Sequence, residues 1–336
     1  MSRNTWWSAG RCVVALALWA TVGLQSCAGE SGEKSERVAG RTEPLGALNI
    51  LTRNVDAGRS GANLSETVLK TSNVNTSTFG KVFELPVDDQ VFAGLLYASS
   101  VTIGGVSHNV VYAATVNNSV YAFDADAGGA PLWQKNFNNG AVPVFHTQVG
   151  QNCGTYNDMS GNIGIVGTPV IDGNSLTMYF VTRTFESGTT FVQRLRAIDI
   201  TTGNERVTAR TIGTIDPQLN NQHAGLALSQ NKVYVAWASH CDTGEYHGRV
   251  LAFNVGDLSQ AGAFDAVPSG HQAGIWMSSA APIVDASGNL FYATGNSDSP
   301  QTSDNFAESM VKLGPTLTVG DYFTASNADA LNAADD

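Results

Sequence analysis

The sequence predicts an all-β fold, because a strand pattern repeats along the chain and the composition favours turns. Residues 111–133 read VYAATVNNSVYAFDADAGGAPLW, where two alternating apolar runs flank a polar turn and so predict a β-hairpin. A further strand begins near Trp133, after an Asp-Ala-Gly-Gly turn. Charged residues make up only 14% of the chain and glycine occurs 35 times, which suits turn-rich β structure.

The hairpin pattern returns three more times, from Met178, from Val233 and from Leu290. The strand pairs are MYFVT with LRAID, VYVAW with VLAFN, and LFYATG with SMVKL. One aromatic residue marks each copy, at intervals of 55 to 67 residues: Tyr112, Tyr179, Tyr234 and Tyr292. Repeated units of this kind must stack on one another to bury their faces. We therefore predict a β-propeller of four-stranded antiparallel blades, with about four to five blades present.

The motif V-Y-x-x-T-x-x-x-x-V-Y-A-F-D-A-x-x-G-x-x-x-x-W at 111–133 resembles the blade motif of the pyrroloquinoline-quinone (PQQ)-type propellers, the quinoprotein alcohol dehydrogenase-like superfamily. Gly58–Val87 resembles their opening segment, in which residues Lys81–Val87 form a closing outer strand. Gly274–Gly295 resembles a blade start. The resemblance covers residues 48–324, which we expect to be the propeller.

The expected ring is incomplete. Propellers close with roughly four to eight blades, and residues 325–336 carry no blade pattern, so we expect a truncated or disordered end there. The sequence favours the N-terminal portion of a longer protein or a shortened gene. A closed ring of four or five blades is the alternative.

The first 26 residues have the pattern of a signal peptide. Arg3 and Arg11 form a positive region before an apolar run at 12–24, which is short for a membrane span. The peptide ends in Leu-Gln-Ser-Cys at 24–27, which resembles a bacterial lipobox and implies cleavage before Cys27 and its acylation. The alternative is an ordinary secretory signal cut near Ala28. Residues 27–47 lack apolar periodicity and predict a flexible tether.

These features predict a protein of the cell envelope, held to the membrane by its lipid anchor only. Because Ala28 stands where inner-membrane retention usually requires Asp, the outer membrane is favoured over the inner one. The net charge is −11, and loss of Arg3 and Arg11 leaves about −13. Such a surface repels phosphate backbones, so nucleic acid is excluded as a partner.

The mature chain would keep Cys153 and Cys241 in addition to Cys27. In an exported protein two such cysteines predict a disulfide, and adjacent blades could bring their loops together. Two unpaired thiols are the alternative.

The resemblance implies PQQ and calcium as cofactors, with a Trp floor under the quinone, carboxylate and Asn ligands for the metal, an Asp base and a Cys-Cys disulfide. The chain has no Cys-Cys pair, and no set of carboxylate and Asn residues matches that site. Trp276 is the candidate floor residue. Its alternative role is an aromatic that fills space between blades.

A second candidate site is the loop HCDTGEYH, where His240, Asp242 and His247 could converge on one metal ion. The alternative is a polar surface turn. His271 and the segment 296–298 carry the same two interpretations.

Three functions compete. The first is a binding or scaffold propeller of the cell envelope, whose partners are envelope proteins or an extracellular ligand. The second is a fragment of a PQQ- and calcium-dependent alcohol or sugar dehydrogenase. The third is a carbohydrate-binding propeller. We favour the first, because the residues support the fold more strongly than any catalytic site.

Overall fold

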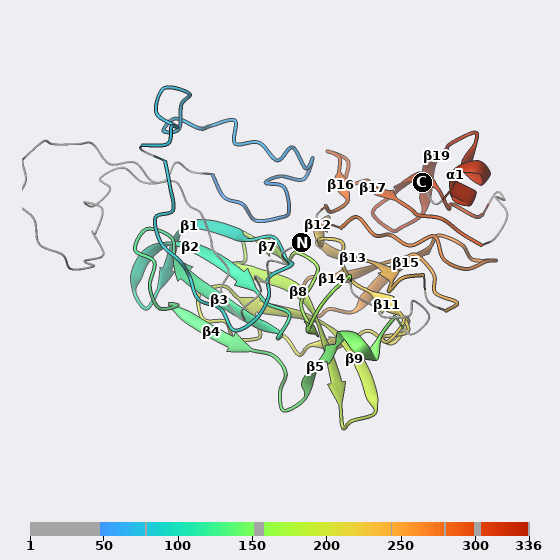
Figure 1. Cartoon of the computed structure of the whole chain (residues 1–336), viewed down its shortest axis with the longest axis horizontal. Coiled ribbons are helices and arrows are strands. Elements are labelled where there is room, and N and C mark those ends of the chain that lie inside the picture. Colours follow the sequence, from blue (N-terminus) through green and yellow to red (C-terminus); the bar gives the residue numbers. More distant parts are fainter. Residues whose placement is uncertain are drawn as a thin grey trace, which may run out of the picture.

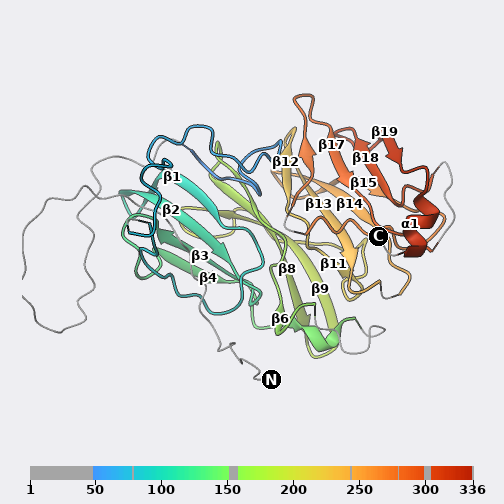
Figure 2. The same cartoon turned by 45° about the horizontal axis from the view of Figure 1, so that its top comes forward.

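The computed structural model describes residues 48–77, 79–150, 158–242, 244–278, 280–298 and 304–334. The signal, Cys27 and the tether lie outside the described residues. Four antiparallel sheets stand side by side as an open arc, from β1–β4 at one end to β17–β19 at the other (Figure 1 and Figure 2). This is a β-propeller whose ring the described residues do not close, which confirms the predicted fold class. We number the sheets blades 1 to 4 in chain order.

Each blade contains four strands that follow one another along the chain. The strands are β1 (Leu96–Ile103), β2 (Val106–Ala114), β3 (Ser119–Asp124) and β4 (Trp133–Asn136) in blade 1; β7 (Val170–Asp172), β8 (Thr177–Glu186), β9 (Thr190–Asp199) and β10 (Arg210–Thr211) in blade 2; β12 (Ala227–Ser229), β13 (Lys232–Ser239), β14 (Arg249–Asn254) and β15 (Gln260–Asp265) in blade 3; and β16 (Ile283–Val284), β17 (Leu290–Ala293), β18 (Ser309–Leu313) and β19 (Val319–Thr324) in blade 4. The four predicted hairpins are therefore β2–β3, β8–β9, β13–β14 and β17–β18.

Shorter elements extend or connect the blades. They are β5 (Val142–Phe145) and β6 (Asn162–Ile163) beside β8, β11 (Asn220–Asn221) beside β13, a 3₁₀ turn at His146–Gln148, and the helix α1 (Ala328–Ala334) after β19. No helix in the described part of the chain is both long enough and apolar enough to cross a membrane.

The core lies between the blades, because alternate residues of each strand point to opposite faces of a sheet. Tyr112 and Ala114 pack with blade 2, whereas Ala113 between them faces away. Separate buried clusters join blades 1 and 2, blades 2 and 3, and blades 3 and 4. We call the face of a blade toward the next blade in chain order its forward face, and the opposite one its backward face.

A tyrosine on the second strand ties each of the first three blades to the next one. The hydroxyl of Tyr112 donates to the Ile200 carbonyl (3.1 Å), and that of Tyr179 to the Val255 carbonyl (3.3 Å). The third bond runs from Tyr234 to the carbonyl of Pro315 (2.8 Å). Each bond crosses a blade boundary, so these tyrosines set how neighbouring blades stack.

The fourth copy differs from the predicted pattern. Tyr112, Tyr179 and Tyr234 each pair with an alanine on the third strand of their blade. In blade 4 the residue in that register is Phe291, which pairs with Lys312. Tyr292 instead points backward into the core shared with blade 3. The repeat marker of the fourth copy is therefore Phe291 and not Tyr292, because the doublet Phe-Tyr offers an aromatic on either face.

Residues 50–59, which we call the strap, run along the first strands of the blades on the inner side of the arc (Figure 2). Ile50 forms two backbone hydrogen bonds with Tyr97 of β1. The Leu51 carbonyl accepts from the amide of Ile171 in β7, and further on the Ala57 carbonyl accepts from the amide of Val284 in β16. The strap thus links blades 1, 2 and 4.

Residues 81–93, which we call the cap, cover the backward face of blade 1. We predicted a closing outer strand over Lys81–Val87, and that prediction is wrong, since these residues form no strand. Leu85 and Val87 are buried against Tyr121 and Phe123 of β3 instead. Side-chain packing across the sheet face, and not backbone pairing along a sheet edge, holds this segment.

Candidate functional site

The structure does not gather His240, Asp242 and His247 around one point. His240 is buried, and its Nε2 faces the guanidinium of Arg183 in blade 2. Burial first, and the charge of Arg183 second, hold the pKa of His240 well below its usual value. The ring is therefore neutral and acts as an acceptor for the arginine.

The other two members have separate partners. Asp242 accepts a hydrogen bond from the Tyr246 hydroxyl, and His247 Nδ1 lies 2.9 Å from both carboxylate oxygens of Asp265. Cys241 and Asp242 both have positive φ, 59° and 47°, and they turn the chain away from His240. In the described part of the chain no three His, Cys, Asp or Glu side chains are placed to hold a metal. The predicted metal site of His240, Asp242 and His247 is therefore not formed in this structure.

Cys241 is disulfide-bonded. Its predicted partner, Cys153, lies outside the described residues, so the pairing of these two cysteines stays a prediction.

Trp276 lies in the segment between blades 3 and 4. A Cβ atom at Gly274 would come within 2.7 Å of the Trp276 Nε1 atom, and one at Gly295 would lie 3.3 Å from the same ring. The amide of Gly295 donates to the Gly274 carbonyl (2.8 Å). The indole is thus packed against two glycines whose backbones pair between the blades. This is the environment of an aromatic residue that fills space between blades, the alternative role of Trp276.

The inner side of the arc does not suit a calcium–quinone site. The strap contributes two cations there, Arg59, whose Nε donates to the Pro282 carbonyl (2.9 Å), and Arg53 beside Gly94. His223 lies near them, and its pKa is lowered by burial and then by the charge of Arg53. Calcium binds through carboxylate and carbonyl oxygens, and neighbouring cations oppose it. The strap and His223 therefore do not suit the calcium ion of that site.

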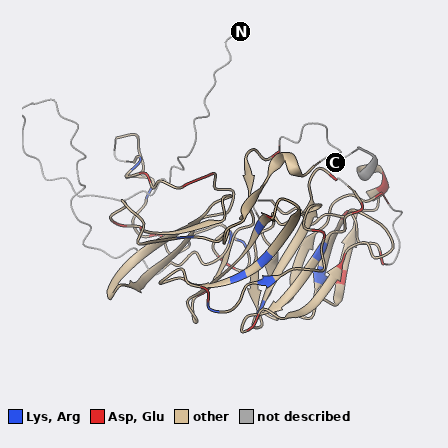
Figure 3. Ribbon diagram, turned by 90° about the horizontal axis from the view of Figure 1, so that it is seen from below, with Lys and Arg blue, Asp and Glu red and all other residues tan. Residues whose placement is uncertain are grey.

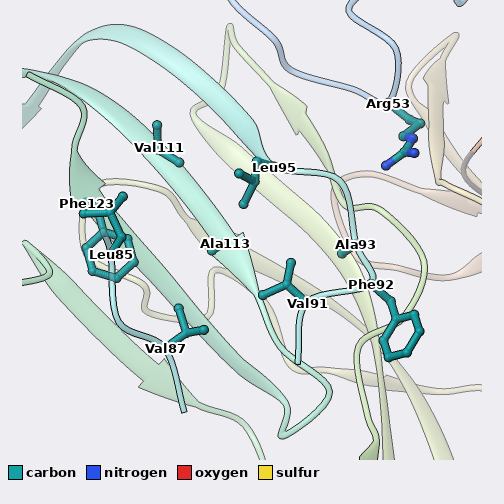
Figure 4. A pocket seen from close by; sticks show the side chains of 10 residues that line it. All are labelled: Arg53, Leu85, Val87, Val91, Phe92, Ala93, Leu95, Val111, Ala113 and Phe123. Atoms are coloured by element: carbon teal, nitrogen blue, oxygen red, sulfur yellow. The ribbon is translucent and has the colours of Figure 1, made fainter. Parts of the chain in front are cut away.

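Two cavities border blades 1 and 2. An apolar one of about 330 Å³ separates the cap from the backward face of blade 1, with Val111, Ala113 and Phe123 on one wall, while Arg53 lies at its edge (Figure 4). The other, of about 460 Å³, is lined by polar groups of blade 2, including Glu186, and by the loop before β5. The first suits an apolar group, whereas the second is lined by the charged side chains of Glu186, Arg194, Arg196 and Glu205.

The forward face of blade 4 is an exposed apolar sheet surface. Its side chains follow two rows of paired residues: Ile283, Phe291, Lys312 and Asp321 in one, and Ala293, Met310 and Phe323 in the other. Exposed fractions are 40% for Ile283, 49% for Met310 and 69% for Phe323. The forward faces of blades 1, 2 and 3 are covered by the next blade, whereas nothing in the described residues buries this one to a similar degree.

Charge on this surface is confined to one row. Lys312 stands where the first three blades have alanine, and its Nζ lies 5.7 Å from the centroid of the Phe291 ring. Asp321 is paired with it on β19. Figure 3 shows the Lys and Arg residues of the strands gathered in the middle of the arc and toward its C-terminal end. An apolar centre rich in aromatic residues and Met, with polar groups at its edge, is the arrangement found in protein interfaces.

Sequence reasoning missed two buried arginines of blade 2, Arg183 and Arg196. Arg196 is 2% exposed, stacks 5.2 Å from the centroid of the Phe137 ring and bonds to Glu205, Thr182 and the Phe137 carbonyl. The available signal was an arginine inside an apolar strand pattern, MYFVTRTF or FVQRLRAID. A buried charge must be paired, so each predicts a partner on another element.

No protein-family model matches the sequence, and no curated protein matches it. Solved structures do resemble the fold. The quinohemoprotein alcohol dehydrogenase from Comamonas testosteroni superposes with a TM-score of 0.53 at 15% identity, over 82% of this chain and 41% of that one. A europium-containing methanol dehydrogenase gives 0.52 at 14% identity, over 83% and 49%. BamB from Moraxella catarrhalis gives only 0.31 at 12% identity, over 75% and 82%.

The fold is therefore that of a PQQ-type β-propeller. Identities of 14–15% show the fold alone, and this chain spans less than half the length of the two dehydrogenases.

Proposed function

We propose that this protein is a binding propeller of the cell envelope, anchored through an acylated Cys27, which holds a partner protein on the forward face of blade 4. The observation that carries the proposal is the exposed apolar surface formed by Ile283, Phe291, Met310 and Phe323. Soluble proteins rarely expose several large apolar side chains next to one another, and patches of this kind mark binding sites.

The three blade boundaries inside the chain indicate what kind of surface fits. At each of them an apolar sheet face is covered by the backward face of another antiparallel sheet. We therefore propose that the partner presents a β-sheet face with an apolar centre and with charges that complement Lys312 and Asp321. Exported proteins rich in β structure present sheet faces of this kind.

Site-specific photo-crosslinking in intact cells tests the interface. A photoreactive amino acid at Met310, which is 49% exposed, should form an adduct with one partner protein. The same amino acid at Val142, 56% exposed on β5, is the matched control and should not. Phe323→Glu should reduce the Met310 adduct, whereas Val106→Glu on blade 1 should not.

The mass of the adduct separates the outcomes. An adduct of twice the chain's own mass would replace the partner protein by a second copy. A crosslink within the protein's own chain would assign the face to a further blade of the same chain and would overturn the proposed interface. Equal labelling at Met310 and Val142, or no labelling at Met310, would overturn the proposed interface. Localisation is tested separately, since Cys27→Ser should release the protein from membranes. Continued sedimentation of that variant with membranes would contradict the lipid anchor and leave the interface untouched.

A further inference from the structure

The apolar cavity between the cap and the backward face of blade 1 runs across the strands of that blade. Phe123 on β3 pairs with Val111 on β2, Val111 pairs with Tyr97 on β1, and Tyr97 forms a bridge with Ile50 of the strap. The row from β3 to the strap therefore spans three strand spacings, or about 14 Å. Figure 4 shows Arg53 of the strap at one end of the cavity and Phe123 at the other.

The walls of the cavity are apolar. Among the described residues that line it, every one is apolar except Arg53. Val111, Ala113 and Phe123 form a closed floor, since they are 4%, 4% and 0% exposed. Leu95 is 36% exposed, so solvent reaches the cavity at this residue. The volume of about 330 Å³ lies at the lower end of the range for small-molecule sites, which suits a slender ligand.

The backbone around Arg53 fixes its guanidinium at the end of the cavity. A Cβ atom at Gly94 would lie only 2.5 Å from the Arg53 Nη1 atom, so glycine is needed to leave room for the guanidinium. The amide of Gly94 donates to the Thr168 Oγ1 atom (2.8 Å) and is held there. Asn54 and Val55, which follow Arg53, have φ of 58° and 76°. A β-branched residue rarely adopts this conformation, and such strained residues cluster at binding sites.

We propose that this cavity binds a single-chain fatty acid, whose hydrocarbon chain lies across β1–β3 and whose carboxylate meets Arg53. The acyl chains of one membrane leaflet fill half of a hydrocarbon core of about 30 Å, so an extended chain of about 15 Å matches the row of strands. A guanidinium forms strong charge-assisted hydrogen bonds with a carboxylate. No acidic residue lines the cavity in the described structure, so nothing in its walls repels that group. The site is separate from the forward face of blade 4.

Isothermal titration with dodecanoate, below the concentration at which it forms micelles, tests the proposal. The protein is the full chain with Cys27→Ser, which carries no acyl group of its own, purified without detergent and stripped of lipid. We expect one saturable site per chain. Val91→Trp and Leu95→Trp should each abolish binding, because an indole at either position fills the cavity. Both positions are partly exposed, so thermal unfolding of these variants should match the parent.

Comparison of headgroups tests the role of Arg53. Arg53→Gln should weaken dodecanoate binding by about tenfold or more, because a hydrogen bond to a charged group is lost. The same variant should bind dodecanol as the parent does, since the alcohol carries no charge. Retained dodecanol binding also shows that the variant keeps its cavity. Equal affinity of the parent for dodecanoate and dodecyltrimethylammonium would overturn the assignment of a fatty acid.

Phe323→Glu and Arg206→Gln are the matched controls. The first disrupts the other exposed apolar surface, where Phe323 is 69% exposed, and the second removes an arginine of blade 2 whose side chain is 38% exposed. Dodecanoate binding should survive both. Absence of saturable binding, binding that survives either tryptophan variant, or loss of binding in Phe323→Glu would overturn the site. None of these results bears on the crosslink at Met310, so the two proposals fail separately.

Discussion

Tyr112 and Ile200 are joined across the first blade boundary by a hydrogen bond of 3.1 Å from the tyrosine hydroxyl to the isoleucine carbonyl. Trp133 Nε1 donates to the same oxygen at 2.9 Å. One backbone carbonyl of blade 2 therefore receives donors from two strands of blade 1. The two aromatic rings also contact each other, with centroids 6.0 Å apart.

Removing these two donors should not be additive. Tyr112→Phe should lower the free energy of unfolding by about 1 kcal/mol, because Trp133 still satisfies the carbonyl. Trp133→Phe should cost at least as much, and the double variant more than the sum, since the Ile200 carbonyl is then left without either donor. Urea denaturation measures all three. Tyr322→Phe, at a residue that is 48% exposed, is the control and should change stability by less than about 0.5 kcal/mol.

Arg196 should be more sensitive than the exposed arginines. Its guanidinium is buried against Phe137 and bonds to Glu205, so Arg196→Ala removes both the ion pair and the packing on the ring. Because Glu205 is 34% exposed and water can solvate it in the variant, we expect a loss of about 2–3 kcal/mol in unfolding free energy. Arg206→Ala is the matched control, because its pair with Asp199 is 38% and 25% exposed and should contribute below about 1 kcal/mol. Equal losses in the two variants would contradict this view of Arg196.

His240 should make stability depend on pH. Burial and Arg183 lower its pKa in the folded chain, whereas the unfolded chain takes up a proton below about pH 6.5. The stability that depends on neutral His240 is thus complete above pH 6.5 and lost as pH falls toward the folded pKa. His240→Gln should flatten the fall of Tm between about pH 7 and 5. Above pH 7 the two curves should run parallel, and parallel curves at all pH values would disprove the assignment.

Substitution of each cysteine tests whether Cys153 is the disulfide partner of Cys241. Cys241 is disulfide-bonded, and Cys153 is its predicted partner. Cys153→Ala and Cys241→Ala should then each destabilise the chain by about 2–4 kcal/mol. The double variant should lose no more than either single one, because both remove the same bond. A thermal melt of Cys153→Ala that matches the parent would exclude Cys153 as the partner.

The blades could be predicted from the sequence because strand alternation is local. VYAAT and VYAFD specify both faces of their own hairpin, and the structure places β2 and β3 there. The fourth repeat shows the limit, since LFYATG carries aromatics on both faces and only pairing with β18 selects Phe291. The predicted metal trio failed for a related reason. The partner of His240 is Arg183, 57 residues earlier, and no spacing within HCDTGEYH reveals it.

The strap has a consequence for the order in which this protein folds. Arg59 bonds to the Pro282 carbonyl across 223 residues of sequence, and Ala57 pairs with β16 in the same region. Hairpins form from near neighbours in microseconds, whereas contacts at such separation must wait for the intervening chain. The Ala57 and Arg59 end of the strap, although synthesised early, therefore docks only after blade 4 exists. Until then this end lacks its contacts with blade 4, whereas Ile50 and Leu51 can already pair with β1 and β7.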